Sequence, residues 1–114
     1  MKKNMNNNEM KIEEAEVVLH LEIEVPEENR SKFFDFCKRA FPVYESTGGN
    51  KMKLYEVESK SGHFNEVGYY RSLEDYKRSE YAIEHDPVQV SLIKEWLTLL
   101  EKPPKVTIYI KRPV

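Results

Sequence analysis

The sequence predicts an α+β fold of the ferredoxin-like β-α-β-β-α-β class, with a four-stranded antiparallel sheet and its helices on one face. Two observations carry this prediction. The first and last predicted strands alternate apolar and polar residues with a period of two, while other segments repeat apolar residues at helical spacing. The pairs Gly48-Gly49 and Pro103-Pro104 separate helices from the strands that follow them.

The chain has the size of one domain. Its 114 residues are 39% hydrophobic and 33% charged, which suits a single core. We expect a disordered N-terminal tail over residues 1–14, which are polar and rich in asparagine, and one folded domain over residues 15–114. The net charge of −2 comes from intermixed signs, so no electrostatic footprint for nucleic acid is present.

Cysteine content and hydropathy indicate the compartment. Cys37 is the only cysteine, which excludes an internal disulfide and favours a reducing environment. No segment has the apolar run of a secretory signal or of a membrane span. We therefore expect a soluble, cytoplasmic protein without a membrane partner.

The first strand and helix follow each other directly. Residues 16–25 place aliphatic side chains at every second position, which predicts a strand with one buried face. Pro26 favours a helix start, and an aromatic stripe that includes Phe33 and Phe41 predicts a helix over residues 26–41.

A hairpin is expected next. Residues 51–58 and 63–71 predict two strands joined by the polar turn 59–62. Gly68 inside the second of these strands indicates either a bulge or the close approach of another group.

Two helix starts follow the hairpin. Ser72 with Asp75 approximates a capping box, and Asp86 before Pro87 is a stronger start, with Gln89 placed to reach back to the cap. The second of these helices carries an apolar stripe at helical spacing, formed by Val88, Leu92, Trp96 and Leu99.

The last predicted strand bears on oligomeric state. Residues 106–111 alternate, with Tyr109 opposite an aliphatic row, and Tyr55 lies similarly opposite apolar residues of the second strand. Both sheet faces would then carry apolar groups. We expect the protein to pair with itself as a homodimer, sheet face against sheet face.

Three passages carry a family resemblance: VVLHLEIEVPEENRSKF, GYYRSLEDYKRSEYAIEHDP and LIKEWLTLLEKPPKVTIYIK. Over residues 16–111 the chain resembles the dimeric α+β barrel superfamily, and within it the antibiotic biosynthesis monooxygenase-like and stress-responsive domains. The resemblance implies a pocket between sheet and helices. Its members include cofactor-free oxygenases of polycyclic phenols, haem-degrading enzymes and isomerases, so the shared fold alone does not name a chemistry.

The positions that haem-degrading members use are occupied differently here. Those members carry an asparagine on the first strand and a tryptophan and a histidine on the second helical segment. The corresponding positions of this chain are approximately Ala82 and Leu92 on the helices, and Leu19 or Leu21 on the strand. The comparison disfavours haem degradation.

Histidines are the candidate proton-transfer groups. His20 lies on the strand face opposite the aliphatic row, where it could act as a base or pack at a dimer interface. His85 precedes the Asp86 cap, where backbone groups could equally satisfy it. His63 flanks a turn and should be exposed. These three histidines lack close spacing, so we expect no metal site.

Aromatic residues are the candidate ligand-binding groups. Tyr55, Tyr69 and Tyr70 could line a pocket and orient a substrate through their hydroxyls, although tyrosines on strands also pack. Trp96 lies on the helical stripe and could be core or pocket wall. Cys37 lies between aromatic residues and should be a buried, inert thiol.

Two functions are compatible with these residues. One is a homodimeric, cofactor-free monooxygenase-like enzyme acting on an electron-rich aromatic molecule, with His20 or His85 transferring a proton. The alternative is a non-catalytic ligand-binding or stress-related dimer. An open cavity that reaches either histidine would favour the enzyme, and a filled layer between helices and sheet would favour the alternative.

Overall fold

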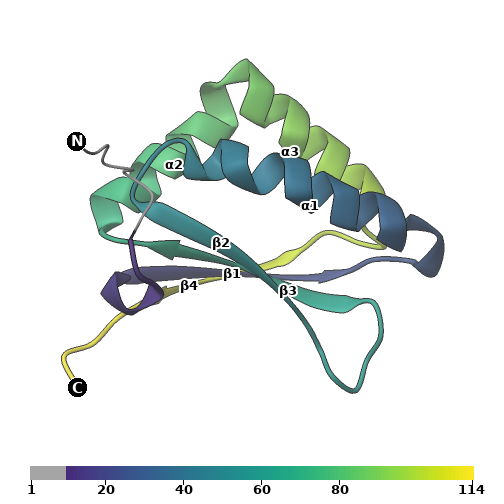
Figure 1. The fold of residues 1–114 in the computed structure, drawn as a ribbon, viewed down its shortest axis with the longest axis horizontal. Helices are drawn as coiled ribbons and strands as arrows, with labels where there is room; N and C mark the ends of the chain where they lie inside the picture. Colours follow the sequence, from purple (N-terminus) through teal and green to yellow (C-terminus); the bar gives the residue numbers. More distant parts are fainter. Residues whose placement is uncertain (1–9) are drawn as a thin grey trace, which may run out of the picture.

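The computed structural model describes residues 10–114, which form one sheet covered by helices (Figure 1). Its strands are β1 (Val17–Glu24), β2 (Asn50–Glu56), β3 (His63–Tyr70) and β4 (Lys105–Ile110), its helices are α1 (Arg30–Glu45), α2 (Leu73–His85) and α3 (Pro87–Leu99), and two short 3-10 turns are η1 (Ile12–Glu14) and η2 (Glu27–Asn29). The strand order is β2-β3-β1-β4, and every neighbouring pair is antiparallel. The ferredoxin-like α+β prediction is confirmed.

The core lies between the sheet and its helical layer. All three α-helices cover the same face of the sheet, and no α-helix of residues 10–114 lies on the opposite face (Figure 1). The core side chains are buried and almost all apolar: Ile23, Val25, Phe33, Phe36, Cys37, Ala40, Phe64, Leu92, Trp96 and Leu99.

Helix α1 runs four residues beyond its predicted end at residue 41. Pro42 lies inside the helix and has no backbone N–H to donate, but the helix continues past it. The carbonyls of Pro42 and Tyr44 accept from the backbone amides of Ser46 and Thr47.

Phe33 of the predicted stripe is fully buried and Phe41 packs against the core, so the stripe does face the sheet. Phe36, which the prediction did not include, is fully buried as well, whereas Phe34 is 41% exposed.

Both predicted helix starts are present. The Ser72 hydroxyl accepts from the Asp75 amide at 3.0 Å, and the Asp86 carboxylate accepts from the Gln89 amide at 3.2 Å. The Gln89 side chain does not reach back to the cap. Its amide instead donates to the Val43 carbonyl at 3.5 Å, which ties α3 to α1.

Residues 10–16, which precede β1, contain the short turn η1. Residues 1–9 of the predicted tail lie outside the described residues. Within residues 10–14, which the prediction also assigned to the tail, Met10 is 5% exposed and the turn η1 forms. One domain over residues 15–114 stays a prediction.

Gly68 permits a close approach without a bulge. The register of β3 against both neighbours runs unbroken through this residue. A Cβ at Gly68 would lie 2.9 Å from the Tyr70 ring, so the glycine makes room for that aromatic side chain on the helix-covered face.

The uncovered sheet face and β4 remain accessible in the single chain. Tyr55 and Tyr109 lie on this face with 48% and 50% of their surface exposed. The β4 residues Val106 and Ile108 face the helix side, yet 56% and 45% of their surface is exposed because the helices do not extend over this edge strand. Within residues 10–114, no helix combines the length and apolarity that crossing a membrane requires.

Candidate functional site

A cavity of about 280 Å³ lies between the sheet and helices α2 and α3. All four strands and all three helices contribute to its lining. Most of the wall is apolar, including Leu19, Leu21, Met52, Ile83, Ile93 and Val106. The volume approaches the lower end of the range of small-molecule sites, which are typically apolar with a few polar groups.

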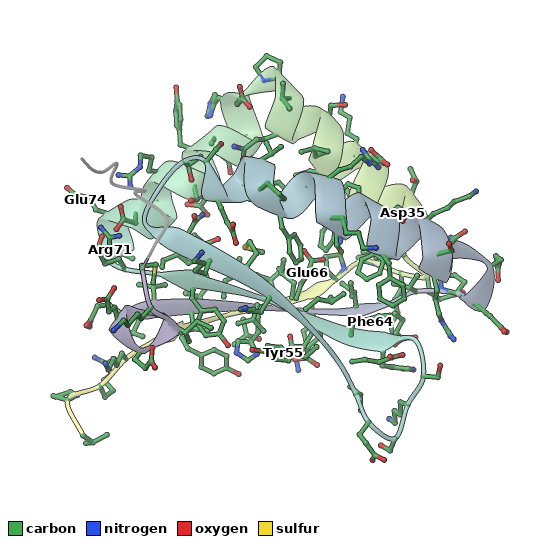
Figure 2. All side chains as sticks on the ribbon, in the orientation of Figure 1. Asp35, Tyr55, Phe64, Glu66, Arg71 and Glu74 are labelled. Atoms are coloured by element: carbon green, nitrogen blue, oxygen red, sulfur yellow. The ribbon has the colours of Figure 1, made fainter. Side chains whose placement is uncertain are left out.

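Glu66 is the buried acid of this cavity. The alternation of β3 turns its side chain toward the helices, between Leu21 on β1 and Leu54 on β2. Figure 2 shows Glu66 between the sheet and the helices, with Tyr55 on the opposite side of the sheet. Glu66 is 2% exposed, and the indole Nε1 of Trp96 donates to its Oε2 at 2.7 Å.

One carboxylate oxygen of Glu66 is available to a ligand in the cavity. Oε1 has no hydrogen-bond partner among residues 10–114. Burial raises the pKa of Glu66 to about 7, and the hydrogen bond from Trp96 opposes that rise. A carboxyl group with such a pKa can exchange protons near neutral pH, as a general base must.

Two tyrosine hydroxyls accompany Glu66 in the cavity. Tyr44 of α1 and Tyr70 of β3 line it, and in both cases burial, together with the nearby charge of Glu66, raises the pKa of the phenol. Among residues 10–114, neither hydroxyl has a hydrogen-bond partner. Neither oxygen is one of the fully buried polar atoms that lack a partner, so both remain accessible from the cavity. Both are therefore free to donate to a ligand.

A polar cluster closes one part of the cavity. The side-chain amide of Asn50 donates to the Tyr44 carbonyl at 3.1 Å and to the Ser79 hydroxyl at 3.2 Å. Ser79 also pairs with the Thr47 hydroxyl at 3.0 Å. The amide orientation of Asn50 follows from the Tyr44 carbonyl, which can only accept. The cluster joins the start of β2 to α2 and fixes the cavity wall.

His20 does not line this cavity. It lies on the uncovered face of the sheet, where its Nδ1 is 2.8 Å from the Asn65 side-chain amide and its ring meets Tyr109 edge-on at 4.8 Å. The predicted ligand residues Tyr55 and Tyr69 lie on the same uncovered face, with their hydroxyls 3.4 Å apart. Burial and this contact raise the pKa of Tyr69 to about 12.

His85 is also outside the cavity. It ends α2, where its Nδ1 is 2.9 Å from the Tyr81 carbonyl and its ring stacks on Tyr81 at 3.9 Å. His63 lies near Glu24, with 4.0 Å between Nδ1 and the carboxylate. Neither His20 nor His85 lines the cavity. A proton-transfer role for either histidine would therefore require a separate site.

Of the predicted ligand residues, the structure brings Tyr70 and Trp96 together. Both line the cavity beside Glu66. The sequence alone did not lead us to Glu66, although a signal was present. Glu66 alternates in step with Phe64 and Tyr70, so this acid lies in the same row of β3 as two buried aromatic residues. Adjacent tyrosines at 69 and 70 obscured that row.

Cys37 and the possible metal ligands are the remaining candidate groups. Cys37 is 6% exposed, and burial raises the pKa of its thiol, which keeps it protonated and unreactive. No group of three or more histidine, cysteine or acidic side chains suited to a metal ion occurs among residues 10–114.

Comparisons with known proteins bear on the fold. No family model matches the sequence, and no curated protein matches it significantly. Solved structures do match over most of both chains, at low sequence identity.

Three of these structures illustrate the similarity. A conserved protein from Methanosarcina mazei Go1 has a TM-score of 0.75 at 14% identity, with 89% of this chain and 97% of that chain covered. SnoaB from Streptomyces nogalater, a cofactor-independent oxygenase, has a TM-score of 0.71 at 11% identity, with coverage of 86% and 94%. An antibiotic biosynthesis monooxygenase has a TM-score of 0.69 at 8% identity, with coverage of 85% and 99%. The chain therefore has the α+β ferredoxin-like fold of the antibiotic biosynthesis monooxygenase-like proteins, and the resemblance stated from the sequence is confirmed for the fold.

Proposed function

We propose that the protein binds a small aromatic molecule in the cavity and oxidises it as a cofactor-free monooxygenase, with Glu66 as the general base. The observation that carries this proposal is the unpaired Oε1 of a buried carboxyl group in a mostly apolar cavity. Apolar walls suit an aromatic ring, and the carboxylate suits an acidic hydroxyl on that ring. The fold of SnoaB, a cofactor-independent oxygenase, supports the reaction class.

The proposed reaction takes its electrons from the substrate. Glu66 removes the proton of a ring hydroxyl and leaves an electron-rich phenolate, which the hydroxyls of Tyr44 and Tyr70 can stabilise by donation. The phenolate reduces dioxygen. One oxygen atom forms a carbon–oxygen bond in the product, and the other leaves as water with the two hydrogens that the substrate loses.

Oxygen uptake on a panel of phenols and quinols tests the enzyme. Glu66→Gln keeps the shape of the side chain and removes the base, so uptake should fall by about a hundredfold or more. His20→Ala is the control, because His20 lies on the other face of the sheet. Full activity of Glu66→Gln, or loss of activity in His20→Ala alone, would contradict the assignment. Binding of phenols without oxygen uptake would support the non-catalytic ligand-binding alternative.

We also propose that the protein is a homodimer in the cytoplasm. The uncovered sheet face supports the dimer, because exposed aromatic groups such as Tyr55 and Tyr109 favour burial against a second copy. Sizing chromatography with light scattering tests this, and a strict monomer would contradict it. The single, buried Cys37 suits a reducing compartment.

A further inference from the structure

Among residues 10–114, the charged groups that line the cavity are all acidic. Glu66 lies inside, and Glu80 and Glu84 of α2 lie at the exposed rim, while no lysine, arginine or histidine of these residues belongs to the lining. Among residues 10–114, neither rim carboxylate forms a salt bridge. The Tyr76 hydroxyl donates to Glu80 at 3.4 Å, so a neutral group is the nearest hydrogen-bond partner of this acid.

The negative charges of the two rim carboxylates act on tyrosines of the cavity wall. The charges of Glu80 and Glu84 contribute, after burial, to raising the pKa of Tyr76, and Glu80 does the same for Tyr70. A field that disfavours an ionised tyrosine also disfavours an anionic ligand at the same place. It favours a cation by the same physics.

Aromatic faces complete this environment. Tyr70 and Tyr76 meet edge to face at 5.2 Å, and Trp96 closes the inner wall. Aromatic side chains such as these pack favourably, edge to face or offset, against the ring of a ligand. Glu66 is an independent indication that the cavity binds a ligand. It is only 2% exposed, and one of its carboxylate oxygens has no hydrogen-bond partner in the described chain.

We propose that the ligand of this cavity is an aromatic amine, whose ring lies between Tyr70 and Trp96 and whose ammonium group lies at the rim between Glu80 and Glu84. This inference rests on the proposed function, because it assumes that the cavity binds a small aromatic molecule. It adds the charge of that molecule. An ammonium group would also offset the negative charge that develops on the ring oxygen during the proposed reaction.

Three matched probes test the inference: phenylbutylamine, phenylbutanol and phenylbutyrate, which share a ring and a chain and differ in charge. Trp96 is the only tryptophan and lines the cavity, so its fluorescence reports occupancy without a label. The amine should bind at least about fivefold tighter than the alcohol, and the acid more weakly than either. Added salt should reduce these differences.

Variants locate the effect. Glu80→Gln with Glu84→Gln should bring the affinities of amine and alcohol together, because both carboxylates at the rim are then neutral. The control, Glu74→Gln with Glu101→Gln, makes the same change of net charge at exposed positions outside the lining and should keep the preference for the amine. Circular dichroism confirms that both double variants fold.

The outcomes separate the two proposals. If none of the three probes binds, the cavity is not a ligand site, and both the proposed function and this inference are wrong. If the alcohol or the acid binds as tightly as the amine, only the inference is overturned. It is also overturned if the preference for the amine survives in the Glu80→Gln, Glu84→Gln variant.

Discussion

The nearest sheet neighbours of Glu66 on its face are apolar. Leu21 and Leu54 flank it across the strands, and Phe64 and Gly68 flank it along β3. A carboxyl group in such a place costs free energy of folding, and the single hydrogen bond from Trp96 offsets only part of that cost. Groups that destabilise a fold in this way concentrate at functional sites, which agrees with the role proposed for Glu66.

The first prediction concerns pH and stability. The pKa of Glu66 is about 7 in the folded protein and close to its ordinary value of 4.5 when unfolded. Between these values the folded state binds more protons, so the free energy of unfolding falls as pH rises, by about 3 kcal/mol in total. Urea unfolding at fixed protein concentration should show this fall in the wild type and its absence in Glu66→Gln. Parallel curves for the two proteins would refute the assignment.

Trp96 limits the rise in the pKa of Glu66 that burial causes. Its hydrogen bond lowers the pKa of the carboxyl group, so Trp96→Phe should raise that pKa further. Carbon-13 NMR of the glutamate carboxyl groups measures the change directly, and the rising limb of oxygen uptake against pH should move with it. The exposed Glu101 provides an internal reference signal. An unchanged Glu66 titration would show that the indole has no such effect.

At the scale of elements, Asp86 starts the helix that presents Trp96 to Glu66. Its carboxylate accepts from the Gln89 amide at 3.2 Å. Asp86→Ala should lower the free energy of unfolding by about 1 kcal/mol, the usual cost of a lost helix cap. Asp35→Ala, the same substitution on the exposed side of α1, is the control and should leave stability nearly unchanged. Equal losses in a denaturant titration would count against the cap.

The turn between α1 and β2 also allows a prediction at this scale. Gly48 and Gly49 both have positive φ, at 90° and 73°. A Cβ at Gly48 meets nothing within 4 Å, whereas one at Gly49 would lie 2.5 Å from the carboxylate carbon of Asp75. Gly48→Ala should therefore cost about 1 kcal/mol for its backbone alone, and Gly49→Ala clearly more. Thermal unfolding compares them, and equal melting temperatures would refute the steric term.

The same elements show what sequence could and could not predict. The caps at Ser72 and Asp86 depend on neighbours in the chain, and they form as predicted. The end of α1 depends on packing, because the helix continues through Pro42. The position of Glu66 in the cavity depends on which row of β3 faces the helices and on how β3 pairs with its neighbours, and the whole sheet sets that pairing.

At the scale of the whole molecule, the uncovered sheet face is the interface of the proposed dimer. Tyr109 is half exposed there and packs against His20. Tyr109→Glu would place a charge in the proposed dimer interface and should weaken association by about a hundredfold or more. Tyr81→Glu is the matched control, because Tyr81 is 64% exposed on α2, on the helical side. Sizing chromatography should give a monomer for the first variant only, and an unchanged dimer for Tyr109→Glu would contradict the interface.

The alternation along β3 has a consequence for how such a protein can change over time. Residues 66, 68 and 70 face the cavity, while residues 65, 67 and 69 face the uncovered side. Substitutions at these even positions can alter the cavity and leave the uncovered face intact, and substitutions at these odd positions can do the reverse. Insertion of a single residue just before this stretch would exchange the two sets, and the proposed base and the proposed interface would be lost in one step.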